Sequence, residues 1–515
     1  MAEAVARPLG GATQGVERRN LEIALIIVAG LLARLLLIYR YPMIFGGDTI
    51  ARLAMADQHV VLSHQLPLLE VAIHYVQLIS DHLLLVRYLM AIVGAVAGAG
   101  FYLLMTNFAA PTVALDASLL FVANPLILAD SIVPYQEILM LAGLLFAFHF
   151  ALTERWGLSS VSLGVACLTR YEAWLACPVL MVAYLRNTGR RPRAVLAAIA
   201  LFGWAPLSWM LYNRGITPAG SWAIQWSSNP ERLLRWAHLA AVVLRNAAIP
   251  TLLLAVVGVA VLVRRRLWAT PPYQALIAFG ALFLVAILFS AHGVPPHPEA
   301  SVTEREGHLP LTGVTLLAGV GLALVPRGRH VITALAVAVG LWMADRFVHR
   351  ASSEPHVALS YQVAQYLQNE IPRDDQVAVL AHSVDVEGEL ARVAREHGPG
   401  AVHPFLAALG DLQRWQPPDY ERIRVQSDRG RGRLRSYATW SLGRFADSSG
   451  TRGAQGSAMP GGRPEWVVLW SDFTPTNAVE ADLANEALAR TPRQVFHRDS
   501  VWVRLYALTP DPPSR

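Results

Sequence analysis

The chain has 515 residues, of which 54% are hydrophobic and only 16% charged, and its mean hydropathy is +0.38. This composition excludes a soluble globular protein of the same length and indicates an integral membrane protein. The net charge of +6 comes from 43 arginines and no lysine, and these arginines fall in short clusters between apolar runs, so we expect no nucleic-acid partner.

The N-terminal segment is polar and carries Arg7, Arg18 and Arg19. It leads into the apolar run 21–39 without a small-residue cleavage site, so we expect this run to remain as the first membrane span. We interpret residues 1–20 as a cytoplasmic tail and residues 21–350 as the membrane domain.

The membrane domain contains a series of long apolar runs. A helix that crosses a membrane needs about 20 mostly apolar residues, and by this measure we expect about eleven spans. The expected spans are 21–39, 83–105, 111–128, 138–153, 157–169, 173–186, 194–212, 238–263, 273–291, 309–325 and 331–348.

The positions of the arginines predict the orientation of these spans. When the spans alternate, the arginine clusters all fall on one side, which is the cytoplasmic side of membrane proteins. The clusters are Arg18 with Arg19, Arg155, Arg186 with Arg190, Arg191 and Arg193, Arg264–Arg266, and Arg327 with Arg329. We therefore expect a multi-pass protein of the cell (plasma) membrane, with its N-terminus in the cytoplasm and its C-terminal domain outside.

The first external loop, residues 40–82, carries acidic residues and histidines among apolar residues at roughly helical spacing. This pattern predicts two short helices at the membrane surface rather than a linker. Within the loop, the stretch 45–53 (FGGDTIARL) places Asp48 directly after two glycines, which allow a tight turn. Asp48 is either the cap of a helix or a catalytic carboxylate at the membrane boundary.

The composition changes after Arg350, where charge density rises and the apolar runs shorten. Residues 351–515 are therefore expected to form a small soluble α/β domain outside the membrane. We expect a helix at 356–370, strands at 376–381, 466–470 and 501–508, and a flexible loop at 427–463.

Charged residues gather on the external side of the predicted topology. Charges at the membrane boundary are costly, and they are usually functional or paired. The candidates are Asp48, Asp130, Glu137, Arg170, Glu172 and Arg305. Singly, each has a structural explanation: an Arg170–Glu172 ion pair, for example, or an acid at a helix N-terminus. Together on one face, they favour a functional site.

Four stretches carry a resemblance to a known family. They are YRYPMIFGGDT, NPLILADSIVPYQEILML, CLTRYEAW and EREGHLPLTGVTLLAG. They resemble the GT-C glycosyltransferase superfamily, in the bacterial branch similar to dolichyl-phosphate-mannose-protein mannosyltransferases and the aminoarabinose transferase. The resemblance covers about residues 20–345. It implies an α-helical polytopic GT-C-like fold whose extracytoplasmic tail is the C-terminal domain.

The resemblance implies a transferase that moves a sugar from a polyprenyl-phosphate donor to a lipid, glycan or protein acceptor of the cell envelope. Asp48 matches the catalytic aspartate of the first external loop, where a carboxylate can take the acceptor's proton in an inverting displacement. Arg305 is the first choice for binding the donor phosphate, because a guanidinium forks onto phosphate oxygens. Arg170 is the second choice, and His308 is a helper.

Glu137, His64 and Glu172 are the residues expected to orient the acceptor, and Glu137 could instead hold an arginine in place. Asp130 and Glu137 are seven residues apart rather than in a close pair, so we favour a reaction without a metal or other cofactor. A divalent ion held by Glu137 and Asp48 is the alternative. Cys167 and Cys177 both lie in apolar sequence and are expected to be packing residues.

Two other functions remain open from the sequence. Buried acids and arginines are equally expected in a transporter or flippase of a lipid-linked substrate, and a non-catalytic assembly subunit would use the same polar face for binding. A transporter should place its charges near the middle of the membrane and often shows paired repeats. Here the charges collect on one face and the sequence shows no repeat, which favours the enzyme.

Overall fold

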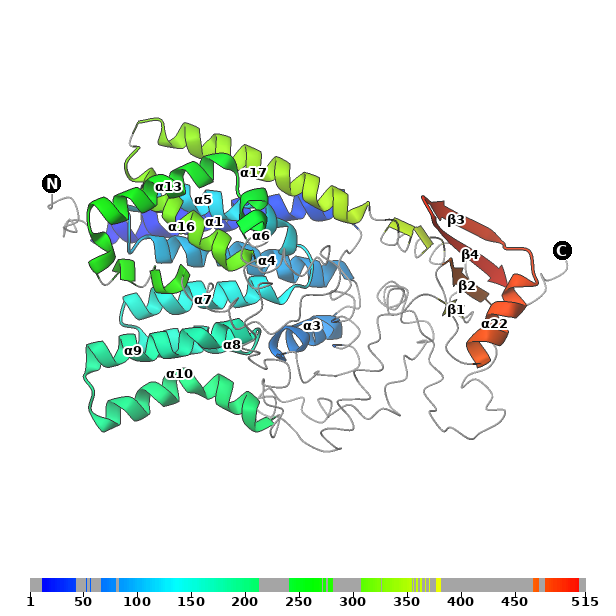
Figure 1. The fold of residues 1–515 in the computed structure, drawn as a ribbon, viewed down its shortest axis with the longest axis horizontal. Coiled ribbons are helices and arrows are strands. Elements are labelled where there is room, and N and C mark those ends of the chain that lie inside the picture. Colours follow the sequence, from blue (N-terminus) through cyan, green and yellow to red (C-terminus); the bar gives the residue numbers. More distant parts are fainter. Residues whose placement is uncertain are drawn as a thin grey trace, which may run out of the picture.

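The computed structural model describes most of the membrane domain and part of the C-terminal domain (Figure 1). The described residues are 12–42, 52, 56, 66–79, 83–212, 240–270, 272–274, 277–280, 307–325, 327–353, 355, 358, 359, 362, 363, 366, 370, 377–380, 466–471 and 478–508. Asp48, His64, Arg305 and the loop expected at 427–463 lie outside them.

The membrane domain is helical, as expected. Its helices are α1 (Ala12–Arg40), α3 (Leu68–Ile79), α4 (Leu83–Met105), α5 (Pro111–Val122), α6 (Pro125–Asp130), α7 (Gln136–Leu152), α8 (Trp156–Cys167), η2 (Tyr171–Leu175), α9 (Ala176–Thr188), α10 (Pro192–Tyr212), α13 (Ile249–Arg264), η3 (Leu267–Ala269), α16 (His308–Leu322) and α17 (Arg329–Ser352). Within the described residues, four helical stretches are long and apolar enough to cross a membrane: Glu17–Arg40, Leu84–Met105, Pro192–Leu211 and Arg329–Ser352. The helices α5, α7, α8, α13 and α16 are apolar but shorter.

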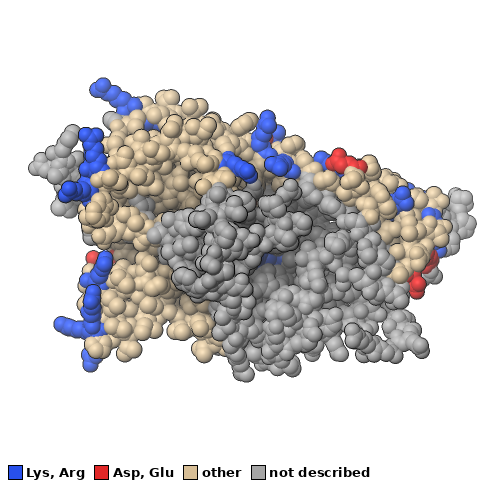
Figure 2. All heavy atoms as spheres, in the orientation of Figure 1, with Lys and Arg blue, Asp and Glu red and all other residues tan. Residues whose placement is uncertain are grey.

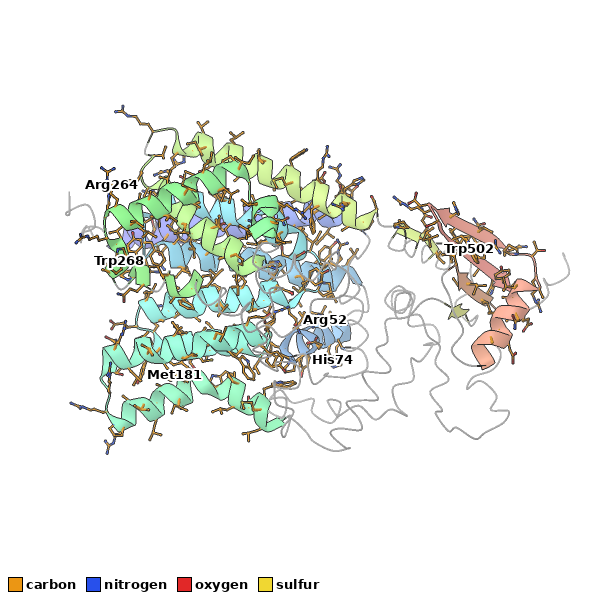
Figure 3. The ribbon with its side chains drawn as sticks, viewed as in Figure 1. Arg52, His74, Met181, Arg264, Trp268 and Trp502 are labelled. Atoms are coloured by element: carbon orange, nitrogen blue, oxygen red, sulfur yellow. The ribbon has the colours of Figure 1, made fainter. Side chains whose placement is uncertain are left out.

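The surface of the bundle fits a membrane environment. Large apolar side chains such as Leu36, Leu211 and Val256 are exposed on the outer helices, where lipid would cover them. Basic side chains gather at the end of the bundle where the chain begins and where α9 meets α10 (Figure 2). This end also carries Arg264 (Figure 3) and corresponds to the cytoplasmic side of the predicted topology.

Two of the expected spans are interrupted by proline. The expected span 111–128 is two helices, because Pro125 has no N–H to continue α5 and Asn124 caps a new helix. The Asn124 side chain accepts hydrogen bonds from the N–H groups of Leu126 and Ile127, at 3.2 and 3.3 Å. Similarly, the expected span 238–263 is interrupted just before Pro250, which lies in the first turn of α13.

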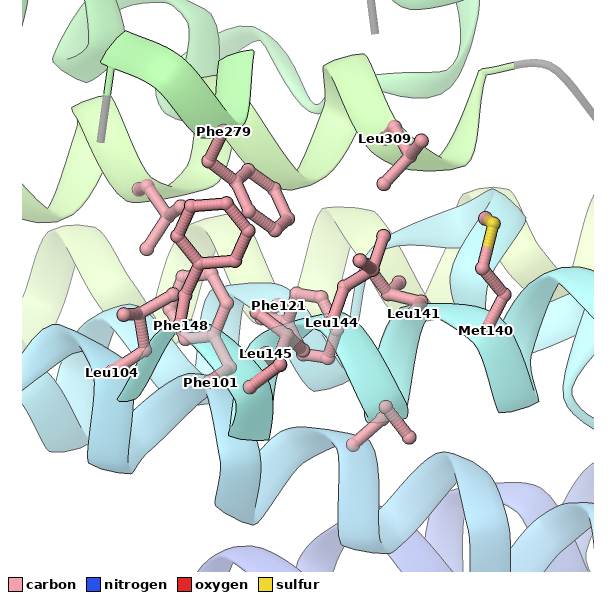
Figure 4. Packing of buried hydrophobic residues seen from close by; sticks show 14 of the residues in the cluster. Phe101, Leu104, Phe121, Met140, Leu141, Leu144, Leu145, Phe148, Phe279 and Leu309 are labelled. Atoms are coloured by element: carbon pink, nitrogen blue, oxygen red, sulfur yellow. The ribbon is translucent and has the colours of Figure 1, made fainter. Parts of the chain in front are cut away.

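The core of the bundle lies between α4, α5, α7 and α16 (Figure 4). The rings of Phe101 and Phe121 stack with centroids 4.6 Å apart, and Phe148 meets Phe279 edge to face at 5.3 Å. Cys167 and Cys177 are buried free thiols in the same core, as their apolar surroundings predicted. This packing fixes the helices whose ends carry the charged residues described below.

Glycines allow α13 and α16 to approach each other closely. A Cβ atom added at Gly321 would lie 2.1 Å from the carbonyl oxygen of Leu254, and one added at Gly258 would lie 2.0 Å from that of Leu317. Both are far below van der Waals contact, so only glycine fits at this crossing.

We therefore expect Gly321→Ala to lower the melting temperature of the purified protein in detergent. The added methyl group overlaps a backbone oxygen that cannot rotate away, and overpacking of this kind costs about 1–3 kcal/mol. Gly313→Ala is the matched control in the same helix, because nothing lies within 4 Å of its added Cβ. Gly313→Ala should leave the melting temperature unchanged or raise it, and equal effects of the two variants would contradict the packing described here.

The first external loop contains one described helix, α3, at Leu68–Ile79. It was expected to lie at the membrane surface, but Leu69, Val71 and Ile73 are buried and only its last residues are exposed. The N–H of Leu68 donates to the carbonyl oxygen of Leu168 at 3.0 Å, which ties the start of α3 to the end of α8. The described part of this loop is therefore packed into the protein.

The C-terminal domain contains a four-stranded sheet in the order β1-β2-β4-β3. Its strands are β1 (Val377–Leu380), β2 (Trp466–Trp470), β3 (Gln494–Arg498) and β4 (Val501–Ala507). β1 is parallel to β2, and the other pairs are antiparallel. β1, β2 and β4 lie where strands were predicted, whereas β3 and the helix α22 (Ala478–Leu488) were not predicted.

Alternate side chains of β2 face opposite layers of this domain. Val467 and Leu469 pack against Leu483 of α22, whereas Val468 packs against Leu359 and Val363, which follow α17. The sheet is thus covered on both faces, and in Figure 1 it lies beyond the C-terminal end of α17.

Candidate functional site

The described charged residues that the sequence singled out surround one turn at the end of the bundle opposite to the basic end. This turn, residues 131–135, joins α6 to α7, and we call it the α6–α7 turn. Asp130 is the last residue of α6, and Glu137 lies in the first turn of α7, where the helix dipole favours an acid. Both side chains are almost completely buried.

Asp130 is paired with His308, the first residue of α16. Its Oδ2 atom lies 2.9 Å from Nε2 of His308, and the two side chains are only 3% and 2% exposed. A buried carboxylate is costly unless it is paired, and this contact supplies the partner. The pair also fixes the imidazole ring at the N-terminal end of α16, three residues after Arg305 in the chain.

Glu137 belongs to a second cluster, with Arg170 and Glu172 at the corner between α8 and α9. The Nε atom of Arg170 donates to Oε2 of Glu172 at 3.0 Å, and its Nη1 atom donates to Glu137. Glu137 is buried, whereas the Arg170 and Glu172 side chains are 23% and 22% exposed. The ion pair expected between Arg170 and Glu172 is therefore present, and Arg170 also holds Glu137.

This geometry bears on the expected role of Arg170 as a second ligand of the donor phosphate. Its guanidinium contacts two carboxylates, so a phosphate would have to displace at least one of them. Two acids around one arginine leave a net negative charge, which suits a role in holding Glu137 and Glu172 better than a role in binding an anion.

Burial raises the pKa of Glu172, but the charge and hydrogen bonds of Arg170 lower it more, so the pKa of this carboxyl lies below its ordinary value of 4.5. A carboxyl whose pKa is lower in the folded than in the unfolded state stabilises the fold above its unfolded pKa, and this contribution is lost as the pH falls through the folded pKa.

We therefore expect acid to destabilise the wild-type protein more than Glu172→Gln, which has no charge to lose. The measurement is the melting temperature in detergent between about pH 6 and pH 3.5, across the range in which carboxyls titrate. The difference in melting temperature between wild type and variant should be largest near pH 6 and should shrink as the pH falls towards 3.5. A constant difference would show that the ion pair does not contribute to stability.

A third pair connects the first external loop to the same turn. Arg52 forms a buried ion pair with Glu70 of α3, and the Gln136 amide donates to the carbonyl oxygen of Leu66 at 3.5 Å. Burial raises the pKa of Glu70 above its ordinary value even though Arg52 and the Gln136 side chain lower it. Figure 3 shows Arg52 beside α3, close to the end of α8. Because Gln136 precedes Glu137, the described part of the loop lies next to the second cluster.

Two buried arginines also reach the α6–α7 turn, and the sequence did not single them out. The Nε atom of Arg34 in α1 donates to Oγ of Ser131 at 2.6 Å. The Nε atom of Arg87 in α4 donates to the carbonyl oxygen of Ile132 at 2.9 Å. Both side chains are fully buried. The signal in the sequence was an arginine within an otherwise apolar span, which is costly and seldom without a role.

Of the residues that the sequence singled out, the structure thus brings Asp130, Glu137, Arg170, Glu172 and His308 together around the α6–α7 turn. Among the described residues, no group of three or more histidines, cysteines or acids could hold a metal ion. The predicted base Asp48, the predicted phosphate ligand Arg305 and the predicted acceptor ligand His64 lie outside the described residues.

No protein-family model matches the chain, and no curated protein matches it. The chain is similar to solved structures of two GT-C glycosyltransferases. One is the apo oligosaccharyltransferase of Archaeoglobus fulgidus, at 12% identity and a TM-score of 0.43, over 68% of this chain and 58% of the archaeal chain. The other is apo ArnT of Cupriavidus metallidurans, at 13% identity and a TM-score of 0.44, over 72% of this chain and 83% of ArnT.

The chain therefore spans less than two thirds of the length of the archaeal enzyme. Similarities with TM-scores below 0.5 assign neither a family nor an activity to this chain.

Proposed function

We propose that this protein is a membrane glycosyltransferase that moves a sugar from a polyprenyl-phosphate donor to an acceptor on the external face of a bacterial inner membrane. The acceptor is a lipid, glycan or protein of the envelope. The observation that supports this most directly is that His308, three residues after Arg305, contacts Asp130 at one end of the α6–α7 turn, while Arg52, four residues after Asp48, is linked through Glu70 to Gln136 at the other end.

Chain length limits how far the two predicted catalytic residues can be from that turn. Arg52 is four residues after Asp48, and such a segment spans at most about 14 Å. His308 is three residues after Arg305, and that segment spans at most about 11 Å. Since Arg52 is linked through Glu70 to Gln136, and His308 is bound to Asp130, a carboxylate and a guanidinium from distant parts of the sequence can act on one substrate.

The proposed reaction is a single displacement at the anomeric carbon. An acceptor oxygen attacks this carbon and transfers its proton to the Asp48 carboxylate, while the bond from the carbon to the phosphate oxygen breaks and the configuration inverts. Arg305 neutralises the charge that grows on the departing phosphate, with His308 beside it. Glu137 and Glu172, held by Arg170, orient the acceptor together with His64.

We further propose that transfer needs no divalent metal. Asp130 and Glu137, the acids nearest to the turn, are engaged by His308 and Arg170, so charge neutralisation can come from arginine and histidine. Transfer should then persist in EDTA at a rate within about twofold of the untreated rate, a margin too small for the loss of a catalytic ion. Loss of turnover that magnesium or manganese restores would instead assign a metal to Glu137 and Asp48.

The test of the function is a transfer assay with the purified full-length protein in nanodiscs. A polyprenyl-phosphate donor with a radiolabelled sugar is incubated with an envelope extract, and label is followed from the donor into lipid, glycan and protein fractions. Transfer that requires the protein supports the enzyme. If proteoliposomes instead move the intact donor across the bilayer with no cleavage of its sugar–phosphate bond, the protein is a flippase and the proposal is wrong.

A further inference from the structure

One side chain joins the C-terminal end of α1 to the α6–α7 turn. Arg87 donates from Nη1 to the carbonyl oxygen of Tyr41 at 2.9 Å and from Nε to the carbonyl oxygen of Ile132, also at 2.9 Å. We infer that Arg87 is a positioning residue, which sets the spacing between the loop that carries Asp48 and the turn that carries Asp130 and Glu137. The inference rests on the proposed function for its catalytic consequence.

The C-terminal end of α1 is held on two sides. Besides the contact of its carbonyl group with Arg87, Tyr41 donates from its hydroxyl group to Oδ1 of Asp345 in α17 at 3.0 Å. Asp345 also forms an ion pair with Arg40 at 3.2 Å. The chain therefore leaves α1 from a point that is fixed to α17 and, through Arg87, to the α6–α7 turn.

The chemistry of these contacts explains why the residue is arginine. A guanidinium presents several N–H donors in a planar fork, so Nε and Nη1 can bind two separate carbonyl oxygens at once. Lysine has a single ammonium group on a flexible stem and cannot keep this geometry. The Arg87 side chain is fully buried, where a cation is costly unless such contacts compensate it.

Both acceptors are backbone carbonyl oxygens, so Arg87 fixes the distance between the backbone at Tyr41 and the backbone at Ile132 and does not orient a side chain. A change in this spacing would move Asp48 relative to the acceptor and to Glu137. Displacement of a catalytic group by about 1 Å can cost about a hundredfold in rate. Because Arg87 is assigned no contact with substrate, donor binding should change little.

Arg34 provides a matched control. It is also a fully buried arginine, and it also contacts the α6–α7 turn, through Oγ of Ser131. Its second contact is the carbonyl oxygen of Gly30, at 2.9 Å within its own helix, so it does not hold the last residues of α1. Arg34→Lys should lower the stability of the protein as the loss of a buried arginine does, but it leaves the hydrogen bond from Arg87 to the carbonyl oxygen of Tyr41 in place.

The experiment combines hydrogen–deuterium exchange with kinetics on the full-length protein in nanodiscs. For Arg87→Lys we expect exchange to become roughly ten- to hundredfold faster in peptides covering 36–42 and 130–136, the range for losing a charge-assisted hydrogen bond. For Arg34→Lys the increase should appear only in 130–136. The turnover number of Arg87→Lys should fall about a hundredfold at a donor KM within about threefold of wild type.

Exchange at 36–42 that is unchanged in Arg87→Lys, or that rises equally in Arg34→Lys, would overturn the inference. If Arg87→Lys cannot be purified, Arg87→Gln keeps an amide donor and should show the same pattern of exchange. The exchange measurement does not depend on catalysis. If the wild-type protein transferred no sugar, the proposed function would be refuted, but exchange would still show whether Arg87 positions the two segments. Normal turnover with faster exchange at both segments would show that the spacing is not important for the reaction.

Discussion

Asp48→Asn is expected to reduce sugar transfer by roughly a hundred- to ten-thousandfold, the loss typical of removing a general base. Asparagine keeps nearly the same shape as aspartate but has no basic oxygen to accept the acceptor's proton. Donor binding should persist, because the donor phosphate is assigned to Arg305. The measurements are donor affinity and transfer rate at saturating donor, for wild type and variant in nanodiscs.

Asp57→Asn is a suitable control, because it removes a carboxylate from the same loop nine residues further along. It should keep a transfer rate within a few fold of wild type, as expected for an acid outside the reacting groups. If Asp48→Asn lost donor binding and kept its rate at saturating donor, Asp48 would be part of the binding site and not the base.

The long apolar helices were predictable because hydropathy alone defines them. The expected span 83–105 matches α4 to the residue, since it is apolar except for Arg87 and contains no proline. Proline caused the main errors, because a hydropathy window averages over Pro125 and Pro250 and does not register the missing N–H. The burial of α3 was also missed, since an amphipathic pattern does not distinguish a helix against lipid from one against protein.

Some of the charged residues around the α6–α7 turn could be selected from the sequence, but their contacts could not. Glu137, Arg170 and Glu172 were selected because each is a charge at the predicted external boundary, and the structure joins them in one cluster. The pairing of Asp130 with His308 needed the fold, because 178 residues separate them. Contacts to backbone atoms, such as those of Arg87, leave no trace in the side chains at positions 41 and 132.

The two ends of the α6–α7 turn therefore have different chemistry. Asp130 pairs with His308, three residues after Arg305 in the chain, whereas the acids held by Arg170 lie next to Gln136, which is linked through Glu70 to Arg52, four residues after Asp48. In the proposed reaction, the lipid phosphate would lie at the first end, where Arg305 would supply the positive charge, and the acceptor hydroxyl group would lie at the second, where the acids would orient it. The anomeric carbon would lie between them, as an inverting displacement requires.

Arg305→Ala should impair both donor binding and the chemical step, which distinguishes it from Asp48→Asn. In the proposed reaction the guanidinium would contact the donor phosphate before the sugar is transferred, so its loss should weaken donor affinity by about ten- to a hundredfold, the value of a charge-assisted hydrogen bond. Negative charge on the departing oxygen then grows as the sugar bond breaks, so the turnover number should fall by a further hundredfold or so. Donor affinity and single-turnover rates measure the two effects separately.

The control for this variant is Arg327→Ala, which lies after the C-terminal end of α16, where the side chain is exposed on the predicted cytoplasmic side. Arg305→Lys adds a sharper comparison, because lysine keeps the positive charge and loses the fork that binds two phosphate oxygens. Compared with Arg305→Ala, Arg305→Lys should recover part of the donor affinity and a smaller part of the turnover number. Donor affinity that is unchanged in Arg305→Ala would remove Arg305 from the phosphate site, and His308, fixed by Asp130 at the start of α16, would become the cation to test next.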